Sequence, residues 1–233
     1  MFLKRSFDKE IMDDFSISDK RIVDALDELK LVNKYLGGIQ TSKAGIKILL
    51  NHRRNKPVKI LDVGSGSSDI FENRNRFPYK LEIISLDRNK KICEVIKSSN
   101  NAHPVFGDVL SLPIAQSSVD IVHASLFLHH FNEDEITEII KAMLSAAKSG
   151  IIINDLRRTV FALLGIKILT AFFSKSVMVK NDAPLSVKRG FVKAELINVL
   201  KKSGIRNYEI KRKWAFRWLI IIFKDGNEQT ISS

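Results

Sequence analysis

The fold class of this chain is decided by one stretch, Lys59-Ile60-Leu61-Asp62-Val63-Gly64-Ser65-Gly66-Ser67-Ser68-Asp69. An apolar run ends in an acid, and two glycines one residue apart follow at once. This pattern is typical of a buried strand that opens into a tight turn before a helix. Glycine lets such a turn bend sharply and lets a ligand approach the backbone. The stretch therefore predicts the first strand and the ligand-binding turn of an α/β domain.

The length and composition fit one globular α/β domain with an additional helical piece. The chain has 233 residues, of which 45% are hydrophobic and 27% are charged. A single cysteine, Cys93, excludes a disulfide framework. Because no signal peptide is visible either, we expect a cytoplasmic location.

The net charge of +12 is unevenly distributed. Residues 1–56 carry +4, residues 57–149 carry −2, and residues 150–233 carry +10. A basic third of this kind suits a nucleic acid or an anionic membrane surface. It equally suits a solvated face that keeps the protein soluble, so charge alone leaves the partner open.

From residue 57 onward, strand patterns alternate with helical ones. This alternation favours a three-layer, Rossmann-like α/β fold with a mostly parallel sheet covered on both faces. The last two strands are joined by a tight turn, so we expect seven strands with an antiparallel last one. The expected strands are Val58–Val63, Leu81–Leu86, His103–Phe106, Val119–Ala124, Ile151–Asn154, Tyr208–Lys213 and Trp214–Lys224. The expected helices are Asp69–Arg76, Lys90–Ser98, Glu133–Ala147, Val160–Phe173 and Lys193–Lys202.

Residues 1–56 form an N-terminal helical extension that is too small to have its own core. We expect a loose or docking arm over residues 1–15, a helix from Ser18 that ends at Gly37-Gly38, and a second helix capped by Thr41 or Ser42. The unit is either a lid over a ligand site or a packing appendage of the main domain, residues 57–224. Residues 225–233 are expected to be a tail.

The apolar run Val160–Phe173 is too short for a membrane span and contains Lys167. We expect a buried or half-exposed helix, with an interfacial membrane helix as the alternative. The polar residues 181–186 that follow are expected to form a loop.

Acids at the ends of successive strands indicate which nucleotide binds. Asp87 lies 21 residues after Gly66, where an acid accepts hydrogen bonds from ribose hydroxyls. Asp69 stands where a dinucleotide site would have glycine or alanine, and Asp62 precedes the turn. Two carboxylates would repel a pyrophosphate but suit a cationic ligand, and no Gly-Lys-Ser/Thr follows the turn. S-adenosylmethionine, with its sulfonium and ammonium groups, fits this site.

These residues resemble the ordered motifs of class I S-adenosylmethionine-dependent methyltransferases, most closely the subgroup that acts on quinone- or phenol-like small molecules. The resemblance covers residues 57–224. It rests on Asp62-Val63-Gly64-Ser65-Gly66, Asp87, Gly107-Asp108, Leu112-Pro113 and Val119–Phe131. Residues 154–158 and 184–187 also resemble bacterial members that are encoded with polyketide or aromatic-lipid pathways. Ser68 departs from the pattern, because many members have a third glycine there.

The resemblance implies a role for each residue of the cofactor site. The backbone of Gly64, Ser65 and Gly66 would hold the methionine part, with Asp62 near its ammonium group and Asp69 beside the turn. Asp87, followed by Arg88, would bind the ribose, and Asp108 and Val109 the adenine. Ser125 and Leu126 would line the sulfonium side.

The candidate catalytic residues follow the fourth and fifth strands. His129 or His130 could deprotonate a phenol, since histidine titrates near neutral pH, and the resemblance favours His130. Both could instead be hydrogen-bonded histidines that shape the pocket. Asn154, followed by Asp155, could orient a hydroxyl group or cap the next helix. One cysteine and scattered histidines give no metal-site signature.

The sequence therefore predicts a methyltransferase for a small, lipophilic aromatic acceptor, with an anionic membrane as a candidate peripheral partner. Two alternatives stay open, an RNA methyltransferase that uses the basic C-terminal third and a non-catalytic S-adenosylmethionine-binding protein. Nucleic acid is disfavoured, because no Asn/Asp-Pro-Pro-Tyr/Phe motif follows the fourth strand. The acceptor, the methylated atom and the oligomeric state are left open.

Overall fold

A seven-stranded sheet forms the centre of the computed structural model, which describes residues 4–14, 16–17, 19–50, 57–66, 68–73, 77–99 and 102–224. The strand order is β3-β2-β1-β4-β5-β7-β6. Only β7 is antiparallel to its neighbours β5 and β6, so the predicted fold class is confirmed. The strands are β1 Val58–Val63, β2 Leu81–Asp87, β3 His103–Phe106, β4 Val119–Ser125, β5 Ala147–Leu156, β6 Tyr208–Lys213 and β7 Arg217–Phe223.

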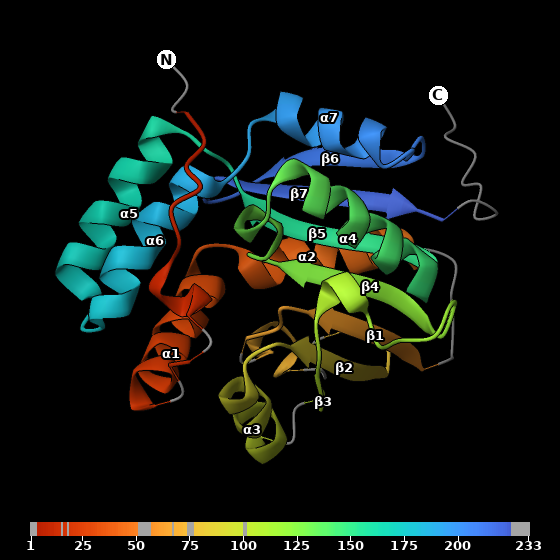
Figure 1. The fold of residues 1–233 in the computed structure, drawn as a ribbon, viewed down its shortest axis with the longest axis horizontal. Coiled ribbons are helices and arrows are strands. Elements are labelled where there is room, and N and C mark those ends of the chain that lie inside the picture. Colours follow the sequence, from red (N-terminus) through yellow and green to blue (C-terminus); the bar gives the residue numbers. More distant parts are fainter. Residues whose placement is uncertain are drawn as a thin grey trace.

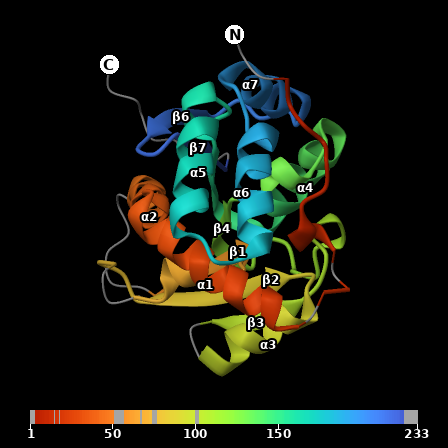
Figure 2. The ribbon, with the colours of Figure 1, turned by 90° about the vertical axis from the view of Figure 1, so that its left-hand side faces the viewer.

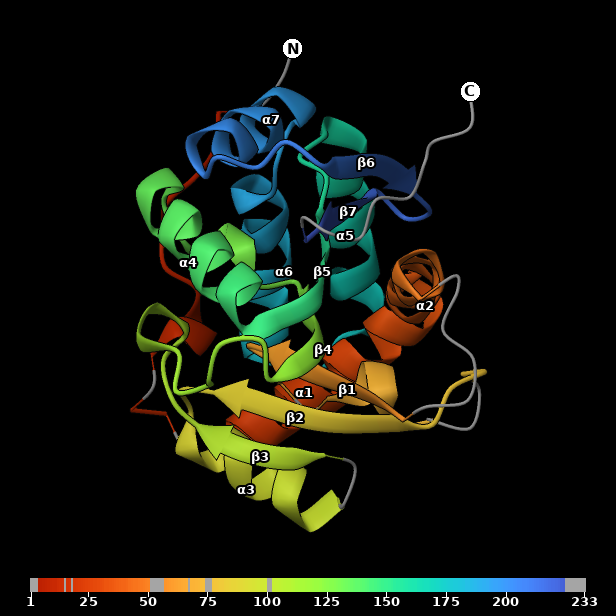
Figure 3. The ribbon, with the colours of Figure 1, turned by 90° about the vertical axis from the view of Figure 1, so that its right-hand side faces the viewer.

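Helices cover both faces of the sheet, because successive side chains of each strand point to opposite sides. Leu61 of β1 packs in one apolar cluster with residues of α4 and α7, and Ile60 packs in another with residues of α2. Figure 3 shows α4 and α7 on one side of the sheet and α2 on the other. The helices are α1 Lys20–Tyr35, α2 Gly38–Leu49, α3 Lys90–Ser99, α4 Glu133–Ala146, α5 Val160–Phe173, α6 Val177–Arg189 and α7 Lys193–Lys202.

The bounds of several predicted elements differ in the structure. The helix after β1 is a 3-10 turn, η2 (Asp69–Phe71), and residues 74–76 of the expected helix lie outside the described part. Helix α2 begins at Gly38, because Gly37 adopts a left-handed φ of 74° and reverses the chain there. Strand β7 begins only at Arg217, since the two residues before it have positive φ.

The predicted loop at residues 181–186 is wrong, since these residues lie within α6. Pro184 lacks an N–H for an intrahelical bond, which is why the sequence reads as a loop. The helix forms because Ser176 caps its N-terminus and because α6 packs along α5. Its polar residues have long-range partners, so their polarity marks an interface within the fold.

The N-terminal arm, residues 4–14, docks on α6 and on the loop after β4. The carboxylate of Asp182 accepts hydrogen bonds from the N–H groups of Ile11 and Met12, at 2.8 and 3.0 Å. The Arg5 guanidinium donates to the carbonyl of Phe131 at 2.9 Å. Figure 2 shows the arm beside α6. Of the two expectations for residues 1–15, a loose arm and a docking arm, the contacts of residues 4–14 favour the second. The predicted tail at 225–233 lies outside the described residues.

Helix α5 is more exposed than the sequence suggested. Only Ala162 and Thr170 are buried, and both Phe172 and Phe173 are 79% exposed. Figure 1 places α1, α5 and α6 together at one end of the sheet, away from the helices that cover its faces. Within the described ranges, no helix combines the length and hydropathy that crossing a membrane requires.

Candidate active site

A cavity of about 590 Å³ opens at the carboxyl ends of β1, β2 and β4. This is the edge at which open α/β sheets bind their ligands, and the volume is in the range of small-molecule sites. One part of its wall is the glycine turn with the ends of β2 and β4. The other part is the N-terminal arm, α1, α6 and the turn that contains His129 and His130.

The glycine turn has a backbone that only small residues tolerate. Gly64 has a φ of 59°, and a Cβ built on it would lie 2.0 Å from the ring of Phe127. Gly66 has a φ of 53°, and its N–H donates to the Asp87 carboxylate at 3.3 Å. Ser68, the residue that replaces the expected third glycine, has a φ of 52°. The left-handed conformation at this position is therefore a property of the turn, and serine adopts it here.

Asp87 ends β2 and faces the cavity. Its carboxylate accepts a hydrogen bond from the N–H of Asn89 at 2.8 Å, besides that of Gly66. Burial among protein groups raises the pKa of Asp87 to about 6, although these donors oppose the shift. Ribose hydroxyls that donate to the carboxylate would stabilise its ionised form.

Most predicted site residues line this cavity. They are Gly64, Ser65, Gly66, Asp69, Asp87, Arg88, Val109, Ser125, Leu126, His129 and His130. Asp62 and Asp108 are not among its lining residues. The Asp108 side chain accepts a hydrogen bond from the N–H of Leu110 at 3.0 Å and lies 3.6 Å from the Arg88 guanidinium.

Asp62 and Asn154 belong to a buried network that runs from β1 toward α2. The Asp62 carboxylate contacts His123 Nδ1 at 2.7 Å, and His123 Nε2 contacts the Ser42 hydroxyl at 2.8 Å. The Asn154 amide donates to the same hydroxyl at 3.0 Å and accepts from Arg217 at 3.1 Å. Asn154 is completely buried and is not among the residues that line the cavity, so the structure gives no support to the expectation that it orients an acceptor hydroxyl.

His129 lies in the short turn η5 (Leu128–His130) between two carboxylates. Its Nδ1 is 2.7 Å from Asp155 Oδ1, and its Nε2 is 3.6 Å from Glu10 Oε1. Burial alone would lower the pKa of the imidazole, but Asp155 and Glu10 together outweigh it and raise the pKa to about 9. With this pKa and no bound ligand, the His129 imidazole is protonated at neutral pH, which disfavours it as a general base.

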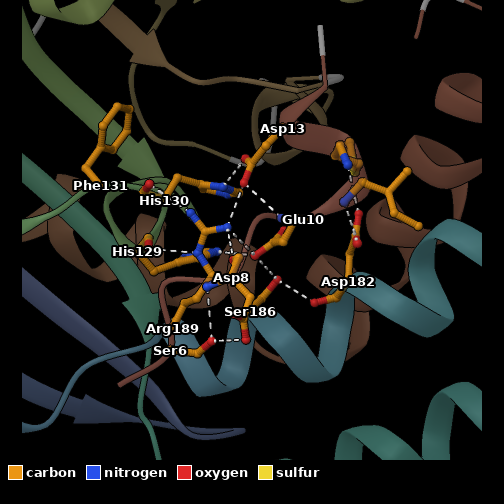
Figure 4. A network of polar contacts seen from close by, with 12 residues as sticks. Ser6, Asp8, Glu10, Asp13, His129, His130, Phe131, Asp182, Ser186 and Arg189 are labelled. Atoms are coloured by element: carbon orange, nitrogen blue, oxygen red, sulfur yellow. Dashed lines mark hydrogen bonds and ion pairs between the residues drawn. The ribbon is translucent and has the colours of Figure 1, made fainter. Parts of the chain in front are cut away.

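His130 is half-buried and is held by the N-terminal arm. Its Nδ1 lies 2.7 Å from Asp13 Oδ1, and Arg189 donates to Asp13 Oδ2 at 2.6 Å. These partners hold the pKa of Asp13 well below its usual range, although desolvation opposes them. Figure 4 shows Glu10 and Asp13 from the arm, the two histidines and Arg189 from α6 meeting in one network.

Sequence reasoning missed the partners of the two histidines. Glu10, Asp13 and Arg189 belong to segments that the sequence treated as an arm and as the residues after a loop. Glu10 is buried and also accepts a hydrogen bond from the Ser186 hydroxyl at 2.9 Å. No spacing or local pattern marks these contacts, because they join residues 59 to 176 positions apart.

Comparisons with known proteins give matches for the domain and for the fold that contain this site. A family described as a methyltransferase domain matches residues 60–150. No curated protein is similar to the chain. Among solved structures, a proposed O-methyltransferase from Nostoc punctiforme PCC 73102 is 16% identical, with a TM-score of 0.56, and 84% of this chain covers 59% of that one.

Two other similar structures contain a ligand. Magnesium protoporphyrin IX methyltransferase from Synechocystis PCC 6803, with bound S-adenosylhomocysteine, is 15% identical over 81% of this chain and 84% of its own, with a TM-score of 0.55. Human N-acetylserotonin methyltransferase, in complex with S-adenosylmethionine, is 12% identical over 94% of this chain and 60% of its own, with a TM-score of 0.65.

Because these sequence identities are low, the solved structures show only that the fold is shared. The family match is a separate finding and concerns residues 60–150. The chain spans about three fifths of the length of the Nostoc and human proteins. The seven-stranded sheet, the glycine turn and the match at residues 60–150 agree with one another. Residues 60–150 of the chain therefore resemble a methyltransferase domain, and the fold is shared with enzymes that were solved with S-adenosylmethionine or S-adenosylhomocysteine bound.

Proposed function

We propose that this protein transfers a methyl group from S-adenosylmethionine to a small, lipophilic aromatic acceptor of the phenol, quinone or polyketide-derived kind. One observation carries the proposal: the glycine turn with Asp87 and the turn with His129 and His130 line the same cavity. The proposed donor site and the proposed polar acceptor site would thus share one cavity, as a direct group transfer requires.

The donor side of the cavity fits S-adenosylmethionine. The hydroxyl groups of Ser65 and Ser125 are buried in its wall and have no hydrogen-bond partner among the described residues. Gly64 leaves the space that a side chain would fill, and Asp87 offers its carboxylate. When bound, the cofactor supplies a methyl group on a sulfonium, which is already a good leaving group. The chain therefore has to align the acceptor and to exclude water.

The proposed acceptor side has both an apolar wall and a cluster of polar groups. Phe7, Met12, Leu29, Phe131 and Val179 line it together with the polar side chains of the arm and of the two histidines. Apolar walls favour a lipophilic acceptor, and a few placed polar groups fix its orientation. We propose that the cluster binds the acceptor hydroxyl and assists the loss of its proton.

The N-terminal unit, residues 1–56, is proposed to be a lid on the domain at residues 57–224. Its arm contributes Phe7, Lys9, Glu10, Met12 and Asp13 to the cavity wall. Polar contacts to α6 and to the loop after β4 hold the arm in place. A docked arm removes water from the reacting groups, and it would have to open for the acceptor to enter.

Methylation assays with a panel of lipophilic phenols and quinols test this proposal. Transfer RNA and ribosomal RNA are tested as alternative substrates. Methylation of a phenol and not of RNA supports it, and methylation of RNA alone would refute it. The comparisons give no support to the RNA alternative or to a non-catalytic protein. A cytoplasmic location stays a proposal that rests on the single Cys93.

A peripheral contact with an anionic membrane is proposed as the source of the acceptor. On α5 the exposed apolar residues Phe161, Leu164, Ile168 and Phe172 repeat at three- and four-residue steps and are 52% to 79% exposed. Residues 157–181 contain five basic residues and no acidic one. An apolar face with basic neighbours suits the headgroup region of anionic lipids. Helix α6, which packs on α5, contributes to the cavity wall.

A further inference from the structure

We propose that Glu10, His129 and His130, whose possible ligand atoms lie within 4.8 Å of one another, bind one divalent transition-metal ion at the acceptor end of the cavity. The site itself is independent of the proposed function. What the ion does there, activation of the acceptor hydroxyl, rests on it. The three ligands come from the arm and from η5, so the docked arm completes the site.

The first observation is a buried nitrogen that has an ion-pair neighbour but no hydrogen bond. His129 is 2% exposed, and its Nε2 has no hydrogen-bond partner among the described residues. Buried polar atoms nearly always have a partner, so an orphan of this kind indicates a missing ligand. Its neighbour Glu10 Oε1, at 3.6 Å, is too far for a hydrogen bond. A tetrahedral ion about 2.1 Å from each atom would set them roughly 3.4 Å apart, which is near the separation found.

The second observation is that a carboxylate holds each imidazole from behind. Asp155 lies 2.7 Å from Nδ1 of His129, and Asp13 lies 2.7 Å from Nδ1 of His130. Histidines that bind metals usually have such a carboxylate or carbonyl on the second nitrogen, which fixes the tautomer and the ring orientation. Nε2 is therefore the nitrogen of each ring that remains for an ion. The two rings stack with centroids 4.3 Å apart, so binding of one ion would turn them toward it.

The third observation is charge. Glu10, Asp13 and Asp155 bring three carboxylates to the cluster, and the Arg189 guanidinium, 2.6 Å from Asp13 and 3.9 Å from Glu10, is a cation that faces them. Arg5 and Arg217 also act on Asp155. Three carboxylates around two imidazoles nevertheless form a set of ligands and neighbours that favours a bound cation, and an imidazole that binds a metal must be neutral.

Two imidazoles and one carboxylate are ligands that zinc, iron(II), manganese(II) and cobalt(II) accept, whereas magnesium and calcium prefer oxygen alone. Three protein ligands leave at least one position open, and the cluster lines the cavity. An acceptor hydroxyl bound there would have a lower pKa and would release its proton to water. Its oxygen would then form the new C–O bond, while the sulfur keeps the electron pair of the broken S–C bond.

Metal binding to the full chain tests the inference. Protein stripped with a chelator is titrated with zinc, manganese(II) or cobalt(II), and the bound ion is counted by elemental mass spectrometry. Cobalt(II) adds a visible absorption band that reports its geometry. The variants are Glu10→Gln, which keeps the volume and an acceptor for the Ser186 hydroxyl, and His130→Ala. His103→Ala, on exposed β3 away from the cluster, is the matched control.

We expect one ion per chain and a visible cobalt spectrum in the native protein and in His103→Ala. Glu10→Gln and His130→Ala should bind each ion at least about tenfold more weakly, since even supporting residues of metal sites have effects of that size. Their melting temperatures and S-adenosylhomocysteine affinities, measured without metal, show that the variants are folded. Absence of a stoichiometric ion, or equal binding by all variants, would overturn the inference.

The metal-free protein separates this inference from the proposed function. Binding of S-adenosylhomocysteine and full activity on an acceptor without any metal uptake would overturn the ion site and leave the methyltransferase proposal standing. Stoichiometric metal in a protein that does not bind S-adenosylhomocysteine would support the ion site and remove the proposed function.

Discussion

Asp87 should control how tightly the cofactor binds and how that affinity depends on pH. Its carboxylate faces the cavity, and burial raises its pKa to about 6. A ribose hydroxyl donates a charge-assisted hydrogen bond, which is the stronger kind, only to the ionised Asp87 carboxylate. Hydrogen bonds to charged groups contribute about 1.5–3 kcal/mol, so Asp87→Asn should weaken S-adenosylhomocysteine binding roughly 10- to 150-fold.

The pH dependence of the native protein follows from the same group. At about pH 5, only about a tenth of Asp87 is ionised if its pKa is near 6. The affinity for S-adenosylhomocysteine should therefore fall about tenfold between about pH 7.5 and about pH 5, because proton release must precede binding. In Asp87→Asn, this part of the pH dependence should be absent.

The pH dependence of stability provides an independent test of the direction in which the pKa of Asp87 is shifted. Asp87 has a higher pKa in the folded protein than its ordinary value of 3.8, so the ligand-free folded state binds more protons between about pH 4 and about pH 6. The contribution of this group to the free energy of unfolding therefore decreases as the pH rises through that window. Asp87→Asn should be at least as stable as the native protein above about pH 6, although it binds the cofactor less well.

Isothermal titration calorimetry with S-adenosylhomocysteine at a series of pH values measures the affinity, and thermal unfolding measures the stability. Glu82→Gln, an exposed acid on the same strand, is the matched control and should leave both unchanged. Native affinity that is constant from about pH 5 to 8, or an Asp87→Asn variant that binds as tightly as the native protein, would refute this reasoning.

Three further predictions concern the turn, the acceptor end and α5. Gly64→Ala should abolish S-adenosylhomocysteine binding in calorimetry, because its Cβ would lie 2.0 Å from the Phe127 ring, and unchanged affinity would contradict this. His130→Ala should lower kcat about 10²- to 10⁴-fold on a phenolic acceptor with an unchanged cofactor affinity, since it acts on the acceptor alone. An equal loss of kcat and of cofactor affinity would indicate a structural role for His130 instead. Phe172→Asp should reduce co-sedimentation with phosphatidylglycerol vesicles several-fold and leave activity on a water-soluble acceptor intact, and unchanged sedimentation would exclude α5 as the contact.

The parallel strands could be predicted from sequence because their signals are local. Each is a short apolar run, and the acid or glycine that ends it lies within a few residues. Leu61 and Ile60 show the limit, since both are apolar and only the fold decides which face each one covers. The cofactor turn was predictable for the same reason, because Gly64, Ser65 and Gly66 are consecutive.

The polar network around the acceptor could not be predicted, because its contacts join distant segments. Asp62 and Asn154 end strands, as cofactor and acceptor residues should, but their side chains turn into a buried network with His123 and Ser42. Glu10 looked like an ordinary acid of an exposed arm, and only the docking of that arm buries it beside His129. Position at a strand end predicts the right edge of the sheet but not the direction of the side chain.

Helix α6 shows how composition misleads when polar residues have tertiary partners. Asp182 and Ser186, together with Pro184, are typical of a loop. In the fold, the Asp182 carboxylate accepts hydrogen bonds from backbone N–H groups of the arm, and the Ser186 hydroxyl donates one to the Glu10 carboxylate. The polar positions therefore face the arm and the cavity, and the helix is stabilised by its packing on α5.

The central claim is most directly tested by thermal unfolding of the full chain with S-adenosylhomocysteine and, separately, with NAD. At about 100 times its dissociation constant, a ligand specific for the folded state adds about 2.7 kcal/mol to the free energy of unfolding. For a chain of this length, that raises Tm by roughly 5–10 °C. We predict this shift with S-adenosylhomocysteine and none with NAD. Stabilisation by NAD alone would contradict the assignment of the glycine turn and of Asp87 to S-adenosylmethionine.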